Sequence, residues 1–206
     1  MKPIHFVLLL FAVALCVSQT DAQWVQIGLS ERGISEIAVG SSGLFAVTTD
    51  SGCVFRTTDG GTNWVQVVDF GGQHIAVAPN GTVFLSRRDS LFRSADAGDS
   101  WTWSGIPRET MTYNIWWTIN AVGIAPSGYV FCGRRLHWQL YGVMGGREDS
   151  LEMSTDNGLT WAPCGVCAGA AFAFAGSLAV SLGGWGSYGP DWGGVERLSV
   201  FRETAG

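Results

Sequence analysis

The amino-acid sequence predicts an all-β fold built from about four similar four-stranded units. An eight-residue pattern with Asp, Gly and Trp at fixed positions occurs three times along the 206 residues. Four apolar runs each lead through a Gly-containing turn into a second apolar run, which is typical of a β-hairpin. The units are about 46 residues long, and this period is typical of the blades of a β-propeller.

The N-terminus has the pattern of a leader peptide. Lys2 precedes an apolar stretch at residues 4–15, and Thr20-Asp21-Ala22 fits a cleavage site between small residues. The apolar stretch is too short to cross a membrane. We therefore expect residues 1–22 to be removed. The mature chain, residues 23–206, is expected to be secreted to the extracellular space or the periplasm, without membrane insertion.

Each unit is expected to fold as one antiparallel blade of the propeller. The first blade, residues 34–68, has predicted strands at residues 34–39, 44–49, 53–57 and 63–68. The second and third blades are predicted at residues 73–106 and 119–163. The fourth, residues 170–206, has predicted strands at 170–174, 177–182 and 197–202 but lacks a final strand.

The repeated pattern is [ST]-x-D-x-G-x-[TNS]-W, and it occupies residues 57–64, 94–101 and 154–161. We call these segments the Asp-Gly turns. The Asp is expected to accept backbone N–H groups and the Gly to take a positive φ, while the Trp ring is buried between neighbouring sheets. The residues with this expected structural role are Asp59, Gly61, Trp64, Asp96, Gly98, Trp101, Asp156, Gly158 and Trp161.

The missing strand of the fourth blade has a candidate at the other end of the chain. Trp24-Val25-Gln26-Ile27 repeats the start of a final strand, Trp64-Val65-Gln66-Val67. In one interpretation, strand 24–27 pairs beside residues 199–201 and closes the ring, which leaves no long edge open. The alternatives are an open arc or a truncated larger propeller.

The Asp-Gly turns resemble the Asp-box, or BNR, repeat of sialidase-type β-propellers, and also the repeats of photosystem II assembly-factor propellers. The resemblance implies that these turns are structural and do not touch a substrate. It also implies two activities as alternatives, a sialidase-like glycoside hydrolase and an assembly factor that docks other proteins. The arginine motif of sialidases is not matched, because Ile106-Pro107-Arg108-Glu109 has these residues in another order. The family enzyme also has more blades than this chain can supply.

Strand order places three long loops, at residues 103–118, 134–149 and 183–197, at the end of the fold opposite the Asp-Gly turns. Aromatic and Arg side chains are enriched in them, and such residues form binding hot spots and stacking surfaces for sugars. The alternative is that the loops bury these rings as a lid over the blades. The candidate binding residues are Tyr113, Trp116, Trp117, Arg134, Arg135, Trp138, Tyr141, Arg147, Trp185, Tyr188 and Trp192.

Other chemistry is not predicted. The net charge of −5 disfavours a nucleic-acid surface, and the two histidines of the mature chain, His74 and His137, are too far apart in sequence to suggest a metal site. No catalytic residue, cofactor or metal is therefore expected. The mature chain retains Cys53, Cys132, Cys164 and Cys167, which are expected to form a structural disulfide or to remain buried thiols. The predicted function is a secreted, non-catalytic propeller that binds a protein or a carbohydrate; its oligomeric state stays open.

Overall fold

A computed structural model describes residues 26, 28–106, 114–140, 144–165, 171–175, 178–188 and 193–202. Every regular element in these residues is a β-strand, which confirms the all-β prediction for this part of the chain. No helix that could cross a membrane is found within these ranges. The predicted leader, residues 1–22, lies outside the described residues, as does predicted strand 24–27 apart from Gln26.

The first two units form separate four-stranded antiparallel sheets, in which the strands follow chain order. The first sheet contains β1 (Ile34–Gly40), β2 (Gly43–Thr48), β3 (Val54–Thr57) and β4 (Val65–Val68). The second contains β5 (Ile75–Val77), β6 (Val83–Arg87), β7 (Ser90–Ser94) and β8 (Thr102–Trp103). Each strand of the first sheet begins and ends within two residues of its expected bounds.

The third and fourth units are joined in one seven-stranded sheet. Its strands are β9 (Ile115–Ile124), β10 (Val130–Leu140), β11 (Met144–Ser154), β12 (Ala162–Gly165), β13 (Ala171–Ala175), β14 (Leu178–Tyr188) and β15 (Gly193–Arg202). The two units meet where Gly145–Glu148 of β11 pairs with Trp185–Tyr188 of β14. The sequence did not predict this pairing.

The expected loops at residues 134–149 and 183–197 are largely strand, so that part of the prediction was wrong. Both segments are long hairpins, β10–β11 and β14–β15, with continuous antiparallel pairing. Their glycines suggested loops, because Gly is depleted in strands. Here Gly145 permits a close backbone approach, since a Cβ at this position would lie 2.8 Å from the carbonyl oxygen of Trp138.

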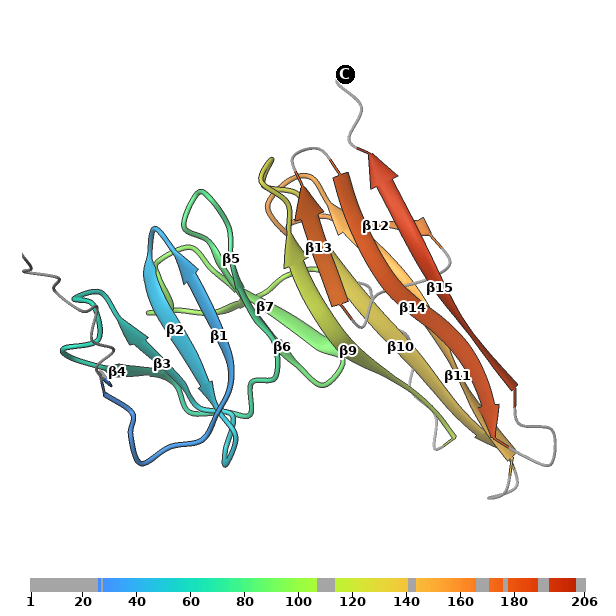
Figure 1. Ribbon diagram of the computed structural model, residues 1–206, viewed down its shortest axis with the longest axis horizontal. Helices are drawn as coiled ribbons and strands as arrows, with labels where there is room; N and C mark the ends of the chain where they lie inside the picture. The colour runs from blue at the N-terminus through green and yellow to red at the C-terminus, as the bar shows by residue number, and fades with distance from the viewer. Residues whose placement is uncertain are drawn as a thin grey trace, which may run out of the picture.

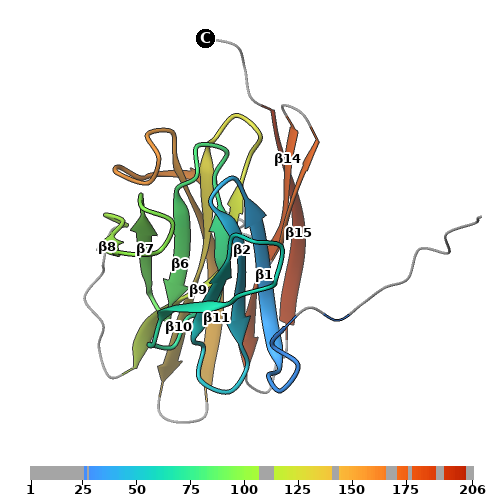
Figure 2. The same cartoon turned by 90° about the vertical axis from the view of Figure 1, so that its left-hand side faces the viewer.

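The first strands of successive units lie next to one another in space. β1 contacts β5, β5 contacts β9, and β9 contacts β13 (Figure 1). Figure 2, viewed from the first sheet, shows the longer strands of the three sheets lying roughly along one axis, with their arrows alternating in direction. The arrangement of the described strands is open, with the first sheet and β15 at opposite ends of the molecule in Figure 1.

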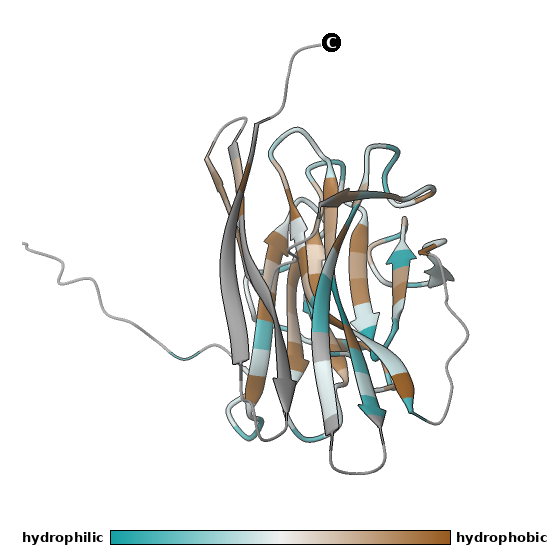
Figure 3. Ribbon diagram, turned by 90° about the vertical axis from the view of Figure 1, so that its right-hand side faces the viewer, coloured by the Kyte–Doolittle hydropathy of each residue, from teal (hydrophilic) through white to brown (hydrophobic). Residues whose placement is uncertain are grey.

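Within the described residues the hydrophobic core forms three clusters, and each lies between consecutive units. Phe45 and Val47 of the first sheet pack with Val83 and Leu85 of the second. Further clusters join the second unit to the third and the third to the fourth. Figure 3 shows apolar stretches in brown on the strands, interrupted by hydrophilic stretches in teal on the long strands of the seven-stranded sheet.

The three Asp-Gly turns have the same hydrogen-bond pattern. In the second turn, the Ser94 hydroxyl donates to the Asp96 carboxylate at 2.7 Å and accepts the Gly98 N–H at 2.7 Å. The Asp96 carboxylate also accepts the Ser100 N–H at 2.8 Å. The first and third turns repeat these contacts, with Thr57 and Ser154 in place of the first hydroxyl residue.

Two consecutive residues in each Asp-Gly turn have a positive φ. These pairs are Gly60-Gly61, Ala97-Gly98 and Asn157-Gly158. The second member of each pair is always Gly, which has no Cβ and tolerates this conformation. In the second turn the first member is Ala97, with a φ of 58°.

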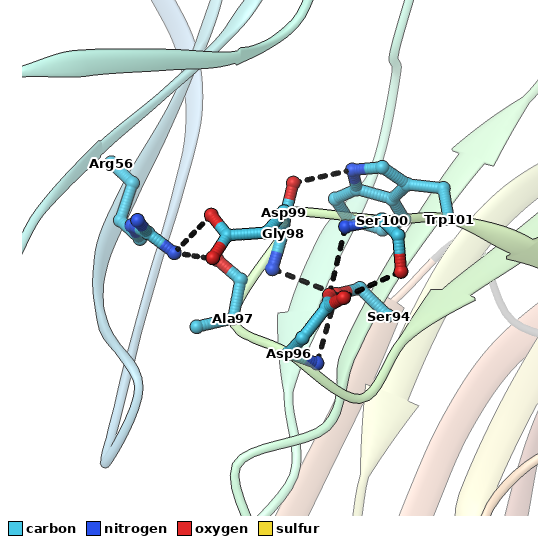
Figure 4. Close-up of polar contacts among 8 residues, drawn as sticks. All are labelled: Arg56, Ser94, Asp96, Ala97, Gly98, Asp99, Ser100 and Trp101. Carbon is cyan, nitrogen blue, oxygen red and sulfur yellow. Dashed lines mark hydrogen bonds and ion pairs between the residues drawn. The ribbon is translucent and has the colours of Figure 1, made fainter.

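The second and third Asp-Gly turns also contact the preceding unit. Arg56 of the first unit donates from Nη1 to the carbonyl oxygen of Ala97 at 2.5 Å and lies 3.1 Å from the Asp99 carboxylate (Figure 4). Asn157 donates from its side-chain amide to the hydroxyl of Thr82 in the second unit at 2.8 Å. The same turns therefore close hairpins and connect neighbouring sheets.

Candidate functional site

The β10–β11 and β14–β15 hairpins project beyond the two smaller sheets and carry most of the predicted binding residues (Figure 1). They connect the second and third strands of their units, whereas the Asp-Gly turns connect the third and fourth. In an antiparallel sheet these two kinds of connection emerge at opposite ends. The described members of the predicted set therefore belong to the end opposite the Asp-Gly turns, although they lie on strands and not on loops.

Trp116 and His137 form a stacked aromatic pair on one face of the long sheet. Trp116 on β9 is opposite His137 on β10 in the strand register. Their ring centroids are 5.2 Å apart and the rings are nearly parallel, at 3°. His137 Nε2 lies 3.0 Å from the Thr118 hydroxyl, which fixes the imidazole plane. Trp116 remains 37% exposed, so a flat aromatic surface is available to solvent.

A bidentate ion pair lies on the same face of the sheet. Arg135 donates from Nε to Asp149 Oδ1 at 2.6 Å and from Nη2 to Oδ2 at 3.0 Å. The side chain of Asp149 is 1% exposed, whereas that of Arg135 is 22% exposed. Two parallel hydrogen bonds fix both side chains, and such a charge-assisted pair is stronger than a neutral one.

Arg134 and Trp117 lie on the other face, because neighbouring residues of a strand point to opposite sides of the sheet. The Arg134 guanidinium lies over the Trp117 ring, 4.4 Å from its centroid. Arg134 Nη1 also lies 3.6 Å from Glu152 Oε1, and the Arg134 side chain is only 3% exposed. Arg134 is thus a core residue beside Cys132, and it is not available to a ligand.

The predicted set is therefore divided between the two faces of the sheet. Trp116 and Arg135 share one face, while Trp117, Arg134 and the half-buried Trp138 belong to the other. The backbone of Trp185 pairs with Glu148 and that of Arg147 with Gly186, so β14 continues this surface. Only the backbones of Arg147, Trp185 and Tyr188 are described. Tyr113, Tyr141 and Trp192 lie outside the described residues.

Sequence reasoning missed a cavity at the same end of the first two sheets. It has a volume of about 610 Å³ and its lining includes Asp50, His74, Arg87 and Arg88. The residues come from the β2–β3 loop, the segment before β5 and the β6–β7 turn. In the sequence, only the adjacent Arg87 and Arg88 could have indicated this cavity. Charged residues in a short hairpin turn are usually just exposed to solvent, so the pair does not by itself predict a cavity.

Several contacts organise the walls of this cavity. His74 Nδ1 lies 3.1 Å from Glu36 Oε2 across the two sheets. Arg88 has a φ of 55°, and its backbone N–H donates to Gln73 Oε1 at 2.7 Å. The Arg88 carbonyl oxygen accepts the Ile119 N–H at 2.7 Å, which connects the cavity wall to β9. Hydrogen bonds from the Thr48 hydroxyl and the Ser51 N–H lower the pKa of Asp50.

The cysteines that the structure describes are free thiols. Cys53, Cys132 and Cys164 have no disulfide partner among the described residues, while Cys167 lies outside them. Burial raises the pKa of Cys132, and it raises that of Cys164 to about 11. For these three residues, the thiol alternative is the one the structure supports.

Comparisons with known proteins give a distant structural similarity. No family model matches the chain, and no curated protein matches it. A crystal structure of a protein of unknown function from Dyadobacter fermentans DSM 18053 is similar, with 19% sequence identity and a TM-score of 0.39. The match covers 69% of this chain and 48% of the other, so it spans about half of that protein.

Proposed function

We propose that this chain is a secreted, non-catalytic β-propeller-type repeat protein that binds carbohydrate at the end opposite its Asp-Gly turns. The observation that carries the proposal is the stacked pair of Trp116 and His137. A sugar ring packs its apolar C–H face on a flat aromatic ring, and Trp116 offers such a ring with 37% of its surface exposed. His137 fixes the plane of this ring before any ligand arrives, which lowers the entropy lost on binding.

The polar groups around Trp116 suit a hydroxyl-rich ligand. Arg135 is held by two hydrogen bonds to Asp149 and keeps a partly exposed guanidinium on the same face. A fixed guanidinium can donate to sugar hydroxyls or to a carboxylate. The combination of one aromatic platform and one oriented polar side chain is typical of small-ligand recognition.

The positions of Asp149 and Glu152 favour binding over hydrolysis at these two carboxylates. A glycosidase normally places two carboxyl groups about 5 to 10 Å apart on either side of one glycosidic bond. On β11, Asp149 and Glu152 belong to opposite faces of the sheet, and each lies in an ion pair with an Arg. Neither is therefore arranged as one half of a catalytic pair.

The repeat architecture supports the propeller part of the proposal. Four hairpin units follow one another, and their first strands are neighbours in space. Three of the units contain an Asp-Gly turn with the same hydrogen bonds between their third and fourth strands. Secretion rests on the leader pattern of residues 1–22, and mass spectrometry of the exported protein should find Gln23 as its first residue.

A glycan array followed by calorimetric titration of the best oligosaccharide tests the binding proposal. Trp116→Ala should weaken binding by about 1–3 kcal/mol, as expected for an aromatic anchor, while Trp116→Phe should retain part of the affinity. Leu159→Ala is the matched control, because Leu159 is 60% exposed and lies in the third Asp-Gly turn. Unchanged affinity in Trp116→Ala would contradict the site. Release of sugar from a fluorogenic sialoside would contradict the non-catalytic part.

A further inference from the structure

The first sheet carries apolar side chains on a face that no described residue covers. Ile37 and Val39 of β1 are 63% and 72% exposed. They point to the same side of the sheet, because they are two residues apart on one strand. Ala38, between them, packs in the cluster shared with the second sheet, so the exposed pair lies on the opposite face.

The later units show what normally covers these two positions. Val39 pairs with Leu44 in the first unit, and Val77 pairs with Val83 in the second, so Val39 and Val77 are equivalent positions. By the same register, Ile37 is equivalent to Ile75. Ile75 and Val77 are packed in the cluster between the first two sheets. The equivalent pairs of the third and fourth units, Val122 with Ile124 and Phe172 with Phe174, are packed in the next two clusters. In each of these three cases the covering surface belongs to the preceding unit.

The fourth unit exposes the complementary kind of surface. Phe45 pairs with Arg56 and packs against the second unit. Phe84 pairs with Arg93 and packs against the third unit. The equivalent pair in the fourth unit is Val180 opposite Val200. Val200 is 60% exposed, and Ala173 on the neighbouring strand is also exposed.

We infer that the face of β1 with Ile37 and Val39 is covered by the Val180–Val200 face of a second copy of this chain. The interface would repeat, between molecules, the contact that joins units three times within one molecule. The Val180–Val200 face of the same molecule is not the source, because pairing of β14 with β11 holds the fourth unit in the seven-stranded sheet, at the end of the molecule away from the first sheet (Figure 1). The contact is head-to-tail, so it generates a ring or a filament.

Sedimentation velocity of the purified chain tests the inference. The wild-type protein should associate across about a hundredfold range of concentration. Ile37→Glu and Val200→Glu should each stay monomeric, because each lacks one of the two faces. An equimolar mixture of the two variants should form a one-to-one dimer through the remaining intact pair of faces. Leu159→Glu, a change at a 60% exposed residue outside both faces, should associate like the wild type.

The possible outcomes separate the alternatives. Because Ile37 and Val200 are exposed in the single chain, both Glu variants should keep the melting temperature of the dilute wild-type protein. A wild-type monomer at every concentration, with a lower melting temperature in both variants, would show closure within one molecule and overturn the inference. Variants that still associate, or a mixture that stays monomeric, would also overturn it.

Discussion

Gly158 packs against the ring of Phe84 so closely that a Cβ at position 158 would overlap the ring. Gly158 belongs to the third Asp-Gly turn and Phe84 to the second sheet, so this contact joins two consecutive units. One unit earlier the space is less restricted, because a Cβ at Gly98 would lie 3.3 Å from Val67 and 3.5 Å from the ring of Phe45. In the third turn, Gly158 is therefore required by packing between sheets as well as by its positive φ.

Gly158→Ala should destabilise the fold by about 1–3 kcal/mol, because the added methyl group overpacks the interface in addition to straining the backbone. Urea denaturation followed by Trp fluorescence measures the change. Gly128→Ala is the control for backbone strain alone, since Gly128 has a φ of 93° but no atom within 4 Å of an added Cβ. Equal losses in the two variants would contradict the packing argument.

Ala97→Gly should stabilise the fold by about 1 kcal/mol, because it removes the strain of a non-Gly residue in the left-handed region. Gly60 is the equivalent residue of the first turn, with a φ of 69° and open space around its Cα. Gly60→Ala should therefore have the opposite effect. Thermal denaturation of both variants measures these changes, and a lower melting temperature for Ala97→Gly would refute the strain.

The Asp-Gly turns should make stability depend on acidic pH. Hydrogen bonds from the Ser100 and Ser94 hydroxyls and the Ser100 N–H lower the pKa of Asp96 to about 2. The Asn63 N–H and side-chain amide, with the Thr57 hydroxyl, do the same for Asp59. Because the pKa is lower in the folded than in the unfolded chain, this stabilisation is present above about pH 4 and is lost toward pH 2.

Asp96→Asn should remove one of these contributions. The variant should melt below the wild type at pH 7, and the difference should shrink as the pH falls through the window between about 4 and 2. Melting temperatures measured across this range are the test. A constant difference between variant and wild type down to pH 2 would show that the carboxylate charge has no part in the turn.

The free thiols should differ in reactivity. Cys132 has no exposed surface, so a reagent cannot reach it. Burial also raises its pKa, so the reactive thiolate form is not populated at neutral pH. Cys53 is only half-buried and should react first with iodoacetamide in the folded protein. Peptide mass spectrometry with and without urea separates the two. Labelling of Cys132 before Cys53 under native conditions would contradict the packing of the second cluster.

The parts of the fold that depend on local chemistry could be predicted from the sequence. The β1–β2 hairpin follows from two apolar runs around Ser42-Gly43, and the contacts of Asp96 involve residues within four positions of it. Such short-range signals are complete in the sequence. These signals predicted the order of the strands in each unit. The strand order in turn predicted that residues 134–149 lie at the end of the fold opposite the Asp-Gly turns.

The long sheet and the cavity could not be predicted in this way. Pairing of Gly145 with Tyr188 depends on contacts between distant segments, and glycine-rich segments have a weak strand signal. Once β9 and β10 are recognised as strands, the separation of Trp116 from Trp117 follows from the two-residue period. The cavity combines the segments around Asp50, His74 and Arg88, which no local pattern connects.

The placement of every hydrophobic cluster between consecutive units has a consequence for how such a chain folds and how it changes. A unit taken alone exposes both of its apolar faces, so its stability comes mainly from its nearest neighbours, as in a one-dimensional array. Folding should then begin at any adjacent pair of units and propagate outward. Duplication of one unit of the gene would add a whole interface and leave the existing ones intact, so the number of units could grow by single steps.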